Sequence, residues 1–267
     1  GYSSHPLRLG GEGPLVYVWV TWSWGGANET HTIANTGYDV VVSSPDSTYF
    51  DFPYEVDPAE PGYYWGSRET DTREVFGFMP ENLPANSETM LDRMGAPMEY
   101  AAGGVALSRS FKGIQGHLWS GTIRTARQQD YMAFPRVLAM AERAWSKADW
   151  ELDYNASTTF KSNVDGFVGT SHVDTASRDA EWETFANALG YKELAKLDQA
   201  GVYYRIPVPG ANIEAGKLVA TSSFPGVTNP STEAVSQTHP TPPPQSTPGP
   251  YTPQRHTPTQ HPGETHR

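Results

Sequence analysis

Residues 16–22 read Val16-Tyr-Val-Trp-Val-Thr-Trp22, and residues 38–43 read Tyr38-Asp-Val-Val-Val-Ser43. Both runs are rich in β-branched and aromatic residues, which predicts a strand in each place. The three consecutive valines are typical of a strand buried on both faces in a parallel sheet. Between the runs, residues 29–35 favour a short helix, and Gly37 stands where glycine commonly follows a helix end. Strand, helix and strand form a βαβ unit, so we expect a parallel sheet with helices outside it.

A long connection, residues 51–112, follows this unit and is punctuated by prolines. Loops of this length are usually functional or disordered. The aromatic residues in Phe52-Pro-Tyr54 and Tyr63-Tyr-Trp65 favour a functional loop. Residues 114–119 then predict a further strand of the sheet.

Two amphipathic helices are predicted in the second half of the chain, over residues 131–145 and 180–197. Gly201 stands just beyond the second. The residues expected to face the core are Met132, Val137, Leu138, Ala141 and Trp145 in the first helix, and Trp182, Phe185, Leu189 and Leu194 in the second.

The pattern changes again towards the C-terminus. Residues 202–208 and 217–221 predict short strands, the start of a small β module. From residue 225 onwards Pro, Thr, Ser, Gln and His dominate, and eleven of the 23 prolines lie there. Such a composition cannot bury a core, so we expect this tail to be disordered or extended. The predicted division is therefore 1–14 as an unassigned N-terminal segment, 15–200 as the main α/β domain, 201–224 as the β module and 225–267 as the tail.

Composition excludes several classes of protein. The chain has 267 residues, 37% of them hydrophobic, so it is not disordered throughout. A net charge of −11 argues against nucleic acid as a partner, and no apolar run approaches the length of a membrane span. The absence of cysteine excludes disulfides, thiolate metal sites and a cysteine nucleophile. The chain begins at Gly1 without an initiator Met or a signal peptide, so we expect its natural beginning to be missing.

Aromatic residues and carboxylates gather at the predicted strand ends: Trp19 and Trp24 flank the end of the first, Tyr49 and Asp51 follow the second, and Trp119 ends the third. The carboxyl ends of parallel strands form the active face of an α/β barrel. Flat indole faces stack on the axial C–H groups of a pyranose, while carboxylates and amides bind its hydroxyls. The alternative is that these tryptophans simply pack in the core.

Longer motifs resemble a known family. The segments Trp19-Val-Thr-Trp-Ser-Trp-Gly-Gly26, Tyr49-Phe-Asp-Phe-Pro-Tyr-Glu55 and Tyr63-Tyr-Trp-Gly-Ser-Arg68 are followed by Gly116-His-Leu-Trp-Ser120 and Phe134-Pro-Arg-Val-Leu-Ala-Met-Ala-Glu-Arg-Ala-Trp145. In this order they are similar to β-N-acetylhexosaminidases of glycoside hydrolase family 20, bacterial chitobiases above all. The resemblance covers residues 16–224. It implies the last strands and helices of a (β/α)8 TIM barrel, followed by the start of an immunoglobulin-like β module.

The resemblance also implies a chemistry. Family members use substrate-assisted catalysis, in which the 2-acetamido oxygen of the substrate attacks C1 and forms an oxazolinium ion, an exception to the two-carboxylate scheme. Tyr49 matches the tyrosine that donates to the acetamido oxygen. Trp19 and Trp119 match tryptophans around the terminal sugar, Trp65 the platform for the next sugar, and Asp51 an acidic residue that supports the pocket. Chitobiose and chitooligosaccharides are the implied ligands, with no metal or cofactor and a periplasmic or extracellular location.

Two departures from the family pattern limit what we expect of this chain. Gly121 stands where the family has a glutamate that binds the outer hydroxyls of the sugar. Loss of this charged hydrogen bond would weaken sugar binding by on the order of 1.5–3 kcal/mol. The adjacent Asp-Glu pair, which orients the acetamido group and supplies the general acid, occurs nowhere in the sequence. General acid catalysis typically contributes roughly 10²–10⁴-fold. We therefore expect part of such an enzyme, inactive alone, or alternatively a non-catalytic carbohydrate-binding remnant.

Overall fold

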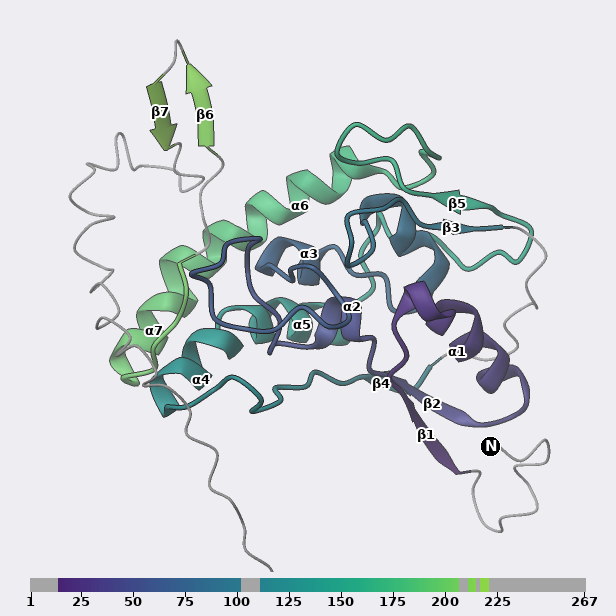
Figure 1. The fold of residues 1–267 in the computed structure, drawn as a ribbon, viewed down its shortest axis with the longest axis horizontal. Helices are drawn as coiled ribbons and strands as arrows, with labels where there is room; N and C mark the ends of the chain where they lie inside the picture. Colours follow the sequence, from purple (N-terminus) through teal and green to yellow (C-terminus); the bar gives the residue numbers. More distant parts are fainter. Residues whose placement is uncertain (1–13, 102–110, 207–210, 215–216, 221–267) are drawn as a thin grey trace, which may run out of the picture. The chain divides into compact units, whose positions relative to one another are not determined.

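The βαβ unit predicted from the sequence is present in the computed structural model, which describes residues 14–101, 111–206, 211–214 and 217–220. Strand β1 (Leu15–Val18) pairs in parallel with β2 (Asp39–Val42), and helix α1 (Gly26–Asn35) connects them. The short strand β4 (Gly113–Ile114) pairs in parallel with the other edge of β2. The resulting sheet has the order β1-β2-β4, with the three strands side by side in Figure 1. The prediction of a parallel sheet is confirmed.

The first strand is shorter than predicted, because it ends at Val18 instead of Trp22. Two glycines explain the difference. Gly25 has φ +90°, and a Cβ on Gly26 would stand 2.1 Å from the carbonyl oxygen of Val20. The chain can therefore turn tightly here, and Trp22–Trp24 form a 3-10 helix, η2, instead of a strand.

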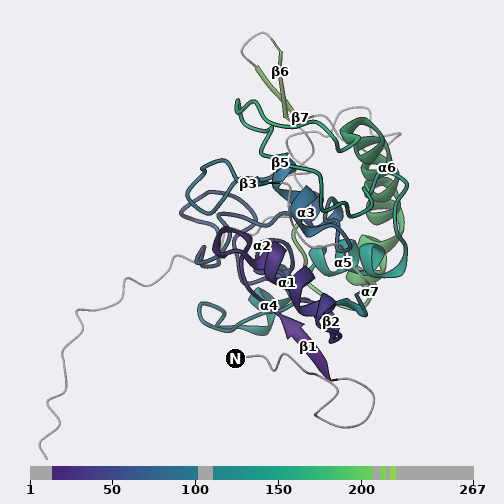
Figure 2. The same ribbon diagram turned by 90° about the vertical axis from the view of Figure 1, so that its right-hand side faces the viewer.

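The second strand lies where predicted, but its burial differs. Val40 and Val42 are buried, whereas Val41 is only half-buried. The prediction of a strand buried on both faces is therefore wrong for the described structure. Helix α1 packs against β2, as Figure 2 shows, and Gly37 after it takes φ +99°, as its predicted position at the helix end requires.

The connection from residue 51 to 112 has little regular structure, as predicted. Its described part contains α3 (Thr72–Phe76), the 3-10 helix η3 (Leu83–Thr89) and β3 (Glu99–Tyr100), and it is preceded by α2 (Pro45–Thr48). Strand β3 pairs antiparallel with β5 (Phe160–Lys161). The strand predicted over 114–119 is reduced to β4 and to an isolated bridge between Tyr49 and His117.

The helix predicted over 131–145 is in fact two helices, α4 (Ala126–Ala133) and α5 (Arg136–Trp145). They are separated by Pro135, which has no N–H to continue the first helix. The expected apolar stripe is also partly wrong: Met132 is buried and Val137 and Leu138 are half-buried, but Ala141 is exposed and Trp145 is 91% exposed. The buried positions of α5 are Arg136, Ala139 and Arg143.

The second predicted helix is confirmed and begins earlier, at α6 (Thr175–Ala188), capped by the side chain of Asp174. It continues through a π-helical turn, η4 (Leu189–Glu193), into α7 (Leu194–Gln199). Gly201 follows with φ +69°. Leu189 and Leu194 are buried as predicted, while Trp182 and Phe185 are partly buried.

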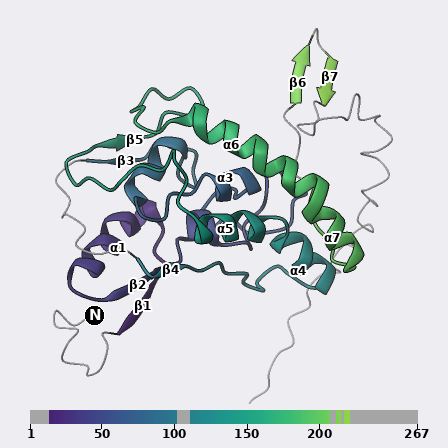
Figure 3. The same ribbon diagram turned by 180° about the vertical axis from the view of Figure 1, so that it is seen from behind.

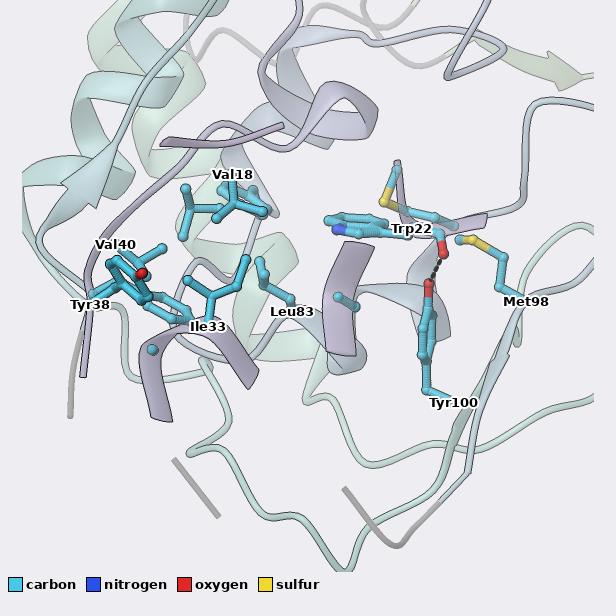
Figure 4. Packing of buried hydrophobic residues seen from close by; sticks show 14 residues of the cluster. Val18, Trp22, Ile33, Tyr38, Val40, Leu83, Met98 and Tyr100 are labelled. Carbon is cyan, nitrogen blue, oxygen red and sulfur yellow. Dashed lines mark hydrogen bonds between the residues drawn. The ribbon is translucent and has the colours of Figure 1, made fainter. Parts of the chain in front are cut away.

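Two hydrophobic clusters hold these elements together. The first lies between the sheet, α1 and η3, and includes Val18, Trp22, Val40 and Tyr100 (Figure 4). The second joins α3, α5 and α6, where Phe76 meets Trp150, Trp182 and Phe185. Figure 3 shows α5 and α6 from behind. The first cluster therefore fixes the strand ends, and the second fixes the helices that follow them.

Near the C-terminus, β6 (Ala211–Glu214) and β7 (Lys217–Ala220) form an antiparallel hairpin. The second predicted β segment thus overlaps a strand, whereas residues 202–206 form none, contrary to prediction. Nearly all of the predicted N-terminal segment, and the whole predicted tail, lie outside the described residues. Among the helices of the described part, none is long and apolar enough to cross a membrane.

Candidate functional site

A pocket of about 490 Å³ opens where the carboxyl ends of the parallel strands meet. Trp19 follows β1 directly, Tyr49 follows β2 after the single turn of α2, and Trp119 follows β4. Trp65 reaches the pocket from the long connection. The complete lining is Tyr17, Trp19, Tyr49, Trp65, Gln115, His117 and Trp119.

Four of the five predicted site residues therefore meet in one pocket, and Asp51 lies outside its lining. Sequence reasoning missed Tyr17, Gln115 and His117. Tyr17 alternates with the buried Val18 in β1, and this alternation was a usable signal that it faces away from the core. His117 lies in the family motif Gly116-His-Leu-Trp-Ser120, but nothing in its spacing indicated that it lines the pocket.

Tyr49 is 1% exposed and sits at the base of the pocket. The backbone fixes it, because the N–H of His117 donates to the carbonyl of Thr48 at 2.9 Å and the N–H of Phe50 donates to that of His117 at 2.7 Å. Burial raises the pKa of Tyr49, the indole of Trp119 opposes this through a hydrogen bond, and the charge of Asp51 adds to it. The hydroxyl therefore stays protonated at neutral pH.

The tryptophans of the pocket are not core residues. Trp19 is 61% exposed and Trp119 is 52% exposed. Trp22, which lies between Trp19 and Trp24 in the sequence, is only 2% exposed and stacks on Phe78. The core-packing alternative thus holds for Trp22 and fails for Trp19 and Trp119. Trp65 is half-buried and lies edge-on to Tyr49, with ring centroids 5.6 Å apart. The pocket is thus walled by indole faces available to a ligand.

Asp51 is buried behind this wall. Burial raises the pKa of its carboxyl, and hydrogen bonds from its own backbone, from the backbone of Trp119 and from the side chain of Trp65 act in the opposite direction. Its carbonyl oxygen accepts from the N–H of Tyr63 at 3.1 Å. Asp51 thus lies beside Trp65 and Trp119 without lining the pocket, and its Oδ1 is buried without a hydrogen-bond partner among the described residues.

Arg136 organises the same region from below and is fully buried. Its guanidinium donates to three carbonyl oxygens outside its own helix region: Phe50 at 2.6 Å, Phe52 at 2.8 Å and Thr70 at 2.9 Å. These carbonyls bracket Asp51 and the loop that carries Trp65. Sequence reasoning missed this role, although an arginine among the apolar positions of a helix was a signal.

Position 121 is open. A Cβ built on Gly121 would meet no atom within 4 Å, so a longer side chain has room there. No residue of the described pocket lining carries a carboxylate. In the described part of the chain, no group of three or more His, Cys, Asp or Glu residues is arranged to hold a metal ion.

The pocket lies at the carboxyl ends of parallel strands, the face on which the active sites of α/β barrels lie. Residues 10–148 match the profile of Glycosyl hydrolase family 20, catalytic domain, and residues 193–242 match that of the Chitobiase/beta-hexosaminidase C-terminal domain. The chain belongs to glycosyl hydrolase family 20, as the motifs predicted. Its three parallel strands are accordingly part of the TIM-barrel-like fold of this family, with a C-terminal module after it.

Curated relatives agree with the family assignment. The chain is 52% identical over 221 residues to a beta-hexosaminidase of Vibrio vulnificus, covering 82% of this chain and 26% of that protein. It is 47% identical over 227 residues to the N,N'-diacetylchitobiase of Vibrio harveyi, covering 85% and 25%. The chain thus spans about a quarter of the length of these relatives.

Solved structures are less similar. The GH20 exo beta-N-acetylglucosaminidase from Vibrio harveyi in complex with N-acetylglucosamine aligns at a TM-score of 0.43 and 23% identity, covering 76% of this chain and 24% of that one. The GH20 beta-N-acetylhexosaminidase from Streptomyces coelicolor aligns at 0.48 and 22% identity, covering 73% and 30%.

Proposed function

We propose that this chain forms the sugar-stacking and acetamido-binding part of a chitobiase-like β-N-acetylhexosaminidase site. The observation that carries the proposal is the convergence of Tyr49, Trp19, Trp65 and Trp119 on one pocket. Its ligands are terminal N-acetylhexosaminides such as chitobiose and chitooligosaccharides. The names of the Vibrio relatives support this substrate class.

Each residue has a role in the proposed reaction. The acetamido oxygen of the substrate attacks C1, the C1–O bond to the leaving group breaks, and an oxazolinium ion forms. The protonated hydroxyl of Tyr49 donates a hydrogen bond to the acetamido oxygen and holds that oxygen in position to attack C1. Trp19 and Trp119 enclose the terminal sugar, Trp65 supports the next one, and Asp51 holds the wall in place.

The leaving group must receive a proton, and the 267 residues contain no adjacent Asp-Glu pair to supply it. The described pocket lining contains no carboxylate either. We therefore propose that these residues by themselves bind N-acetylhexosamine without hydrolysing its glycosides. The binding-only alternative predicts the same for any longer form of the protein.

We also propose the division of the chain at residues 15–200 and 201–224, with an immunoglobulin-like fold for the second part. The family match to residues 193–242 supports a separate C-terminal module in that region. The hairpin of β6 and β7 is compatible with the start of a β-sandwich.

The test combines turnover and binding on the purified chain. Release of p-nitrophenol from p-nitrophenyl N-acetylglucosaminide measures hydrolysis, and calorimetric titration with N-acetylglucosamine-thiazoline, which mimics the oxazolinium ion, measures the pocket. We expect binding without turnover. If the chain neither binds the thiazoline nor releases p-nitrophenol, the proposed pocket is wrong. Turnover would mean that another carboxylate protonates the leaving group.

A further inference from the structure

Trp24 is 60% exposed, although it is the last residue of a turn whose first residue, Trp22, is buried in the core. Its indole lies beside that of Trp65, with ring centroids 6.4 Å apart and ring planes 34° apart. Trp65 lines the pocket and Trp24 does not. Trp24 therefore continues the aromatic wall outwards from Trp65.

The turn that presents Trp24 is fixed on both sides. The N–H of Trp22 donates to the carboxyl of Asp46 at 3.0 Å, and the hydroxyl of Tyr100 donates to the carbonyl oxygen of Trp22, as Figure 4 shows. The N–H of Trp24 donates to the carbonyl oxygen of Thr21 at 3.1 Å, which closes the turn. Trp24 is thus held outwards by a turn whose core end is anchored.

The backbone segments that carry the two tryptophans are also fixed relative to each other. Gly66, the residue after Trp65, is buried against the turn, and a Cβ added to it would stand 2.9 Å from the Cγ2 of Thr21. Thr21 is itself 1% exposed. This close approach joins the loop of Trp65 to the turn of Trp24 and fixes the distance between the two backbone segments.

An exposed indole that continues the wall of a ligand pocket marks a binding surface more often than an isolated exposed residue does. A flat indole offers no charge and no set of directed hydrogen bonds, which suits the apolar C–H face of a neutral sugar ring. The series Tyr49, Trp65 and Trp24 runs from the buried base of the pocket to the surface. One sugar unit beyond the one stacked on Trp65 would meet Trp24.

We propose that Trp24 forms an outer subsite that binds a third N-acetylglucosamine unit of a chitooligosaccharide. This proposal rests on the proposed function and assigns a chain-length preference to the same site. It predicts that the protein discriminates between two and three sugar units, and that Trp24 alone accounts for the difference.

The experiment titrates the 267-residue chain with N,N'-diacetylchitobiose and with N,N',N''-triacetylchitotriose. We expect chitotriose to bind roughly three- to tenfold more tightly, as one added aromatic stacking contact provides. Trp24→Ala should remove this difference and leave chitobiose affinity within about twofold of wild type. Trp145→Ala, which removes a 91% exposed tryptophan of α5 outside the pocket, should change neither affinity.

Equal affinity of the wild type for the two sugars would overturn the outer subsite, and so would equal weakening of both by Trp24→Ala. Titration with N-acetylglucosamine-thiazoline separates this failure from that of the proposed function. If the thiazoline binds and chitotriose gains nothing, only the outer subsite is wrong. If neither the thiazoline nor a sugar binds, both proposals are wrong.

Discussion

The imidazole of His117 lies parallel to the indole of Trp119, with ring centroids 5.2 Å apart and ring planes 9° apart. The same imidazole contacts the ring of Tyr49, at 4.8 Å between centroids. Burial lowers the pKa of His117, so the ring is neutral at physiological pH. A neutral aromatic ring thus packs against the half-exposed indole of Trp119 and fixes the plane of that indole. In the proposed site, a sugar would stack on the exposed part of the indole.

Replacement of His117 tests whether this stacking positions Trp119. We expect His117→Ala to weaken binding of N-acetylglucosamine-thiazoline by roughly three- to tenfold, because Trp119 loses the ring that holds it. His117→Phe keeps a flat ring and should bind within about twofold of wild type. Isothermal titration calorimetry measures both variants. Equal loss in the two would show that the imidazole nitrogens, and not the stack, are required.

Tyr49→Phe tests the proposed donor to the acetamido group. The ring would remain between Trp65 and Trp119, while the hydroxyl, which burial keeps protonated, would be lost. We expect roughly fivefold weaker binding of the thiazoline, the effect of one hydrogen bond. The matched control is Tyr54→Phe, which removes a hydroxyl that donates to the carbonyl of Phe134 at 2.8 Å. That control should lower stability without changing thiazoline affinity, and a similar affinity loss in both variants would contradict the role of Tyr49.

Arg136→Lys tests whether the carbonyl cluster below the pocket depends on the guanidinium. An ammonium cannot reach Phe50, Phe52 and Thr70 together, so buried carbonyls are left without a donor. We expect the free energy of unfolding to fall by about 2–4 kcal/mol. Urea denaturation measures this change, and thiazoline titration under conditions where the variant is folded should show weaker binding. Arg73→Lys, at an exposed ion pair with Asp179, should change neither quantity. If Arg136→Lys unfolds at the same urea midpoint as wild type, Arg136 does not stabilise this carbonyl cluster.

These sites also show what the sequence could reveal. The βαβ unit followed from local patterns, because β-branched runs and Gly37 act within a few residues. Trp22 and Trp24 could not be told apart in this way, since their opposite burial depends on the turn at Gly25 and Gly26. The motifs predicted Tyr49, Trp19, Trp65 and Trp119 as site residues, and the structure places all four in the lining of one pocket. The contacts of Arg136 join residues more than sixty positions apart, and no local pattern contains such contacts.

His31 predicts a pH dependence of stability. It is buried on α1 and stacks on Tyr154, with centroids 4.0 Å apart. Burial lowers its pKa from the ordinary 6.5 to about 4. Between these two pH values the unfolded chain binds the proton more strongly than the folded chain does. The stability contributed by neutral His31 is therefore complete above pH 6.5 and is lost as the pH falls towards 4, by up to about 3 kcal/mol.

His31→Phe should remove this loss and keep an aromatic ring against Tyr154. We expect the free energy of unfolding of the variant, relative to that of wild type, to increase steadily as the pH falls from 7 to 4. Urea denaturation at each pH measures this difference. Burial raises the pKa of Asp46 to about 7, which gives an opposite dependence over an overlapping range. That effect is present in both proteins and cancels in their difference. The exposed His172→Phe is the control, and a pH-independent difference for His31→Phe would exclude the mechanism.

Gly121→Glu is the most direct test of the departure from the family pattern. Its Cβ would meet no atom within 4 Å, so the substitution needs no rearrangement of neighbours. A carboxylate able to accept from the outer hydroxyls of the sugar should strengthen thiazoline binding by about 1.5 kcal/mol or more, which is roughly tenfold. Gly121→Gln has similar length without the charge and should give a smaller gain. If Glu, Gln and Gly bind equally, position 121 does not reach the sugar. Tighter binding for Glu alone would show that a carboxylate at position 121 reaches the sugar bound in this pocket.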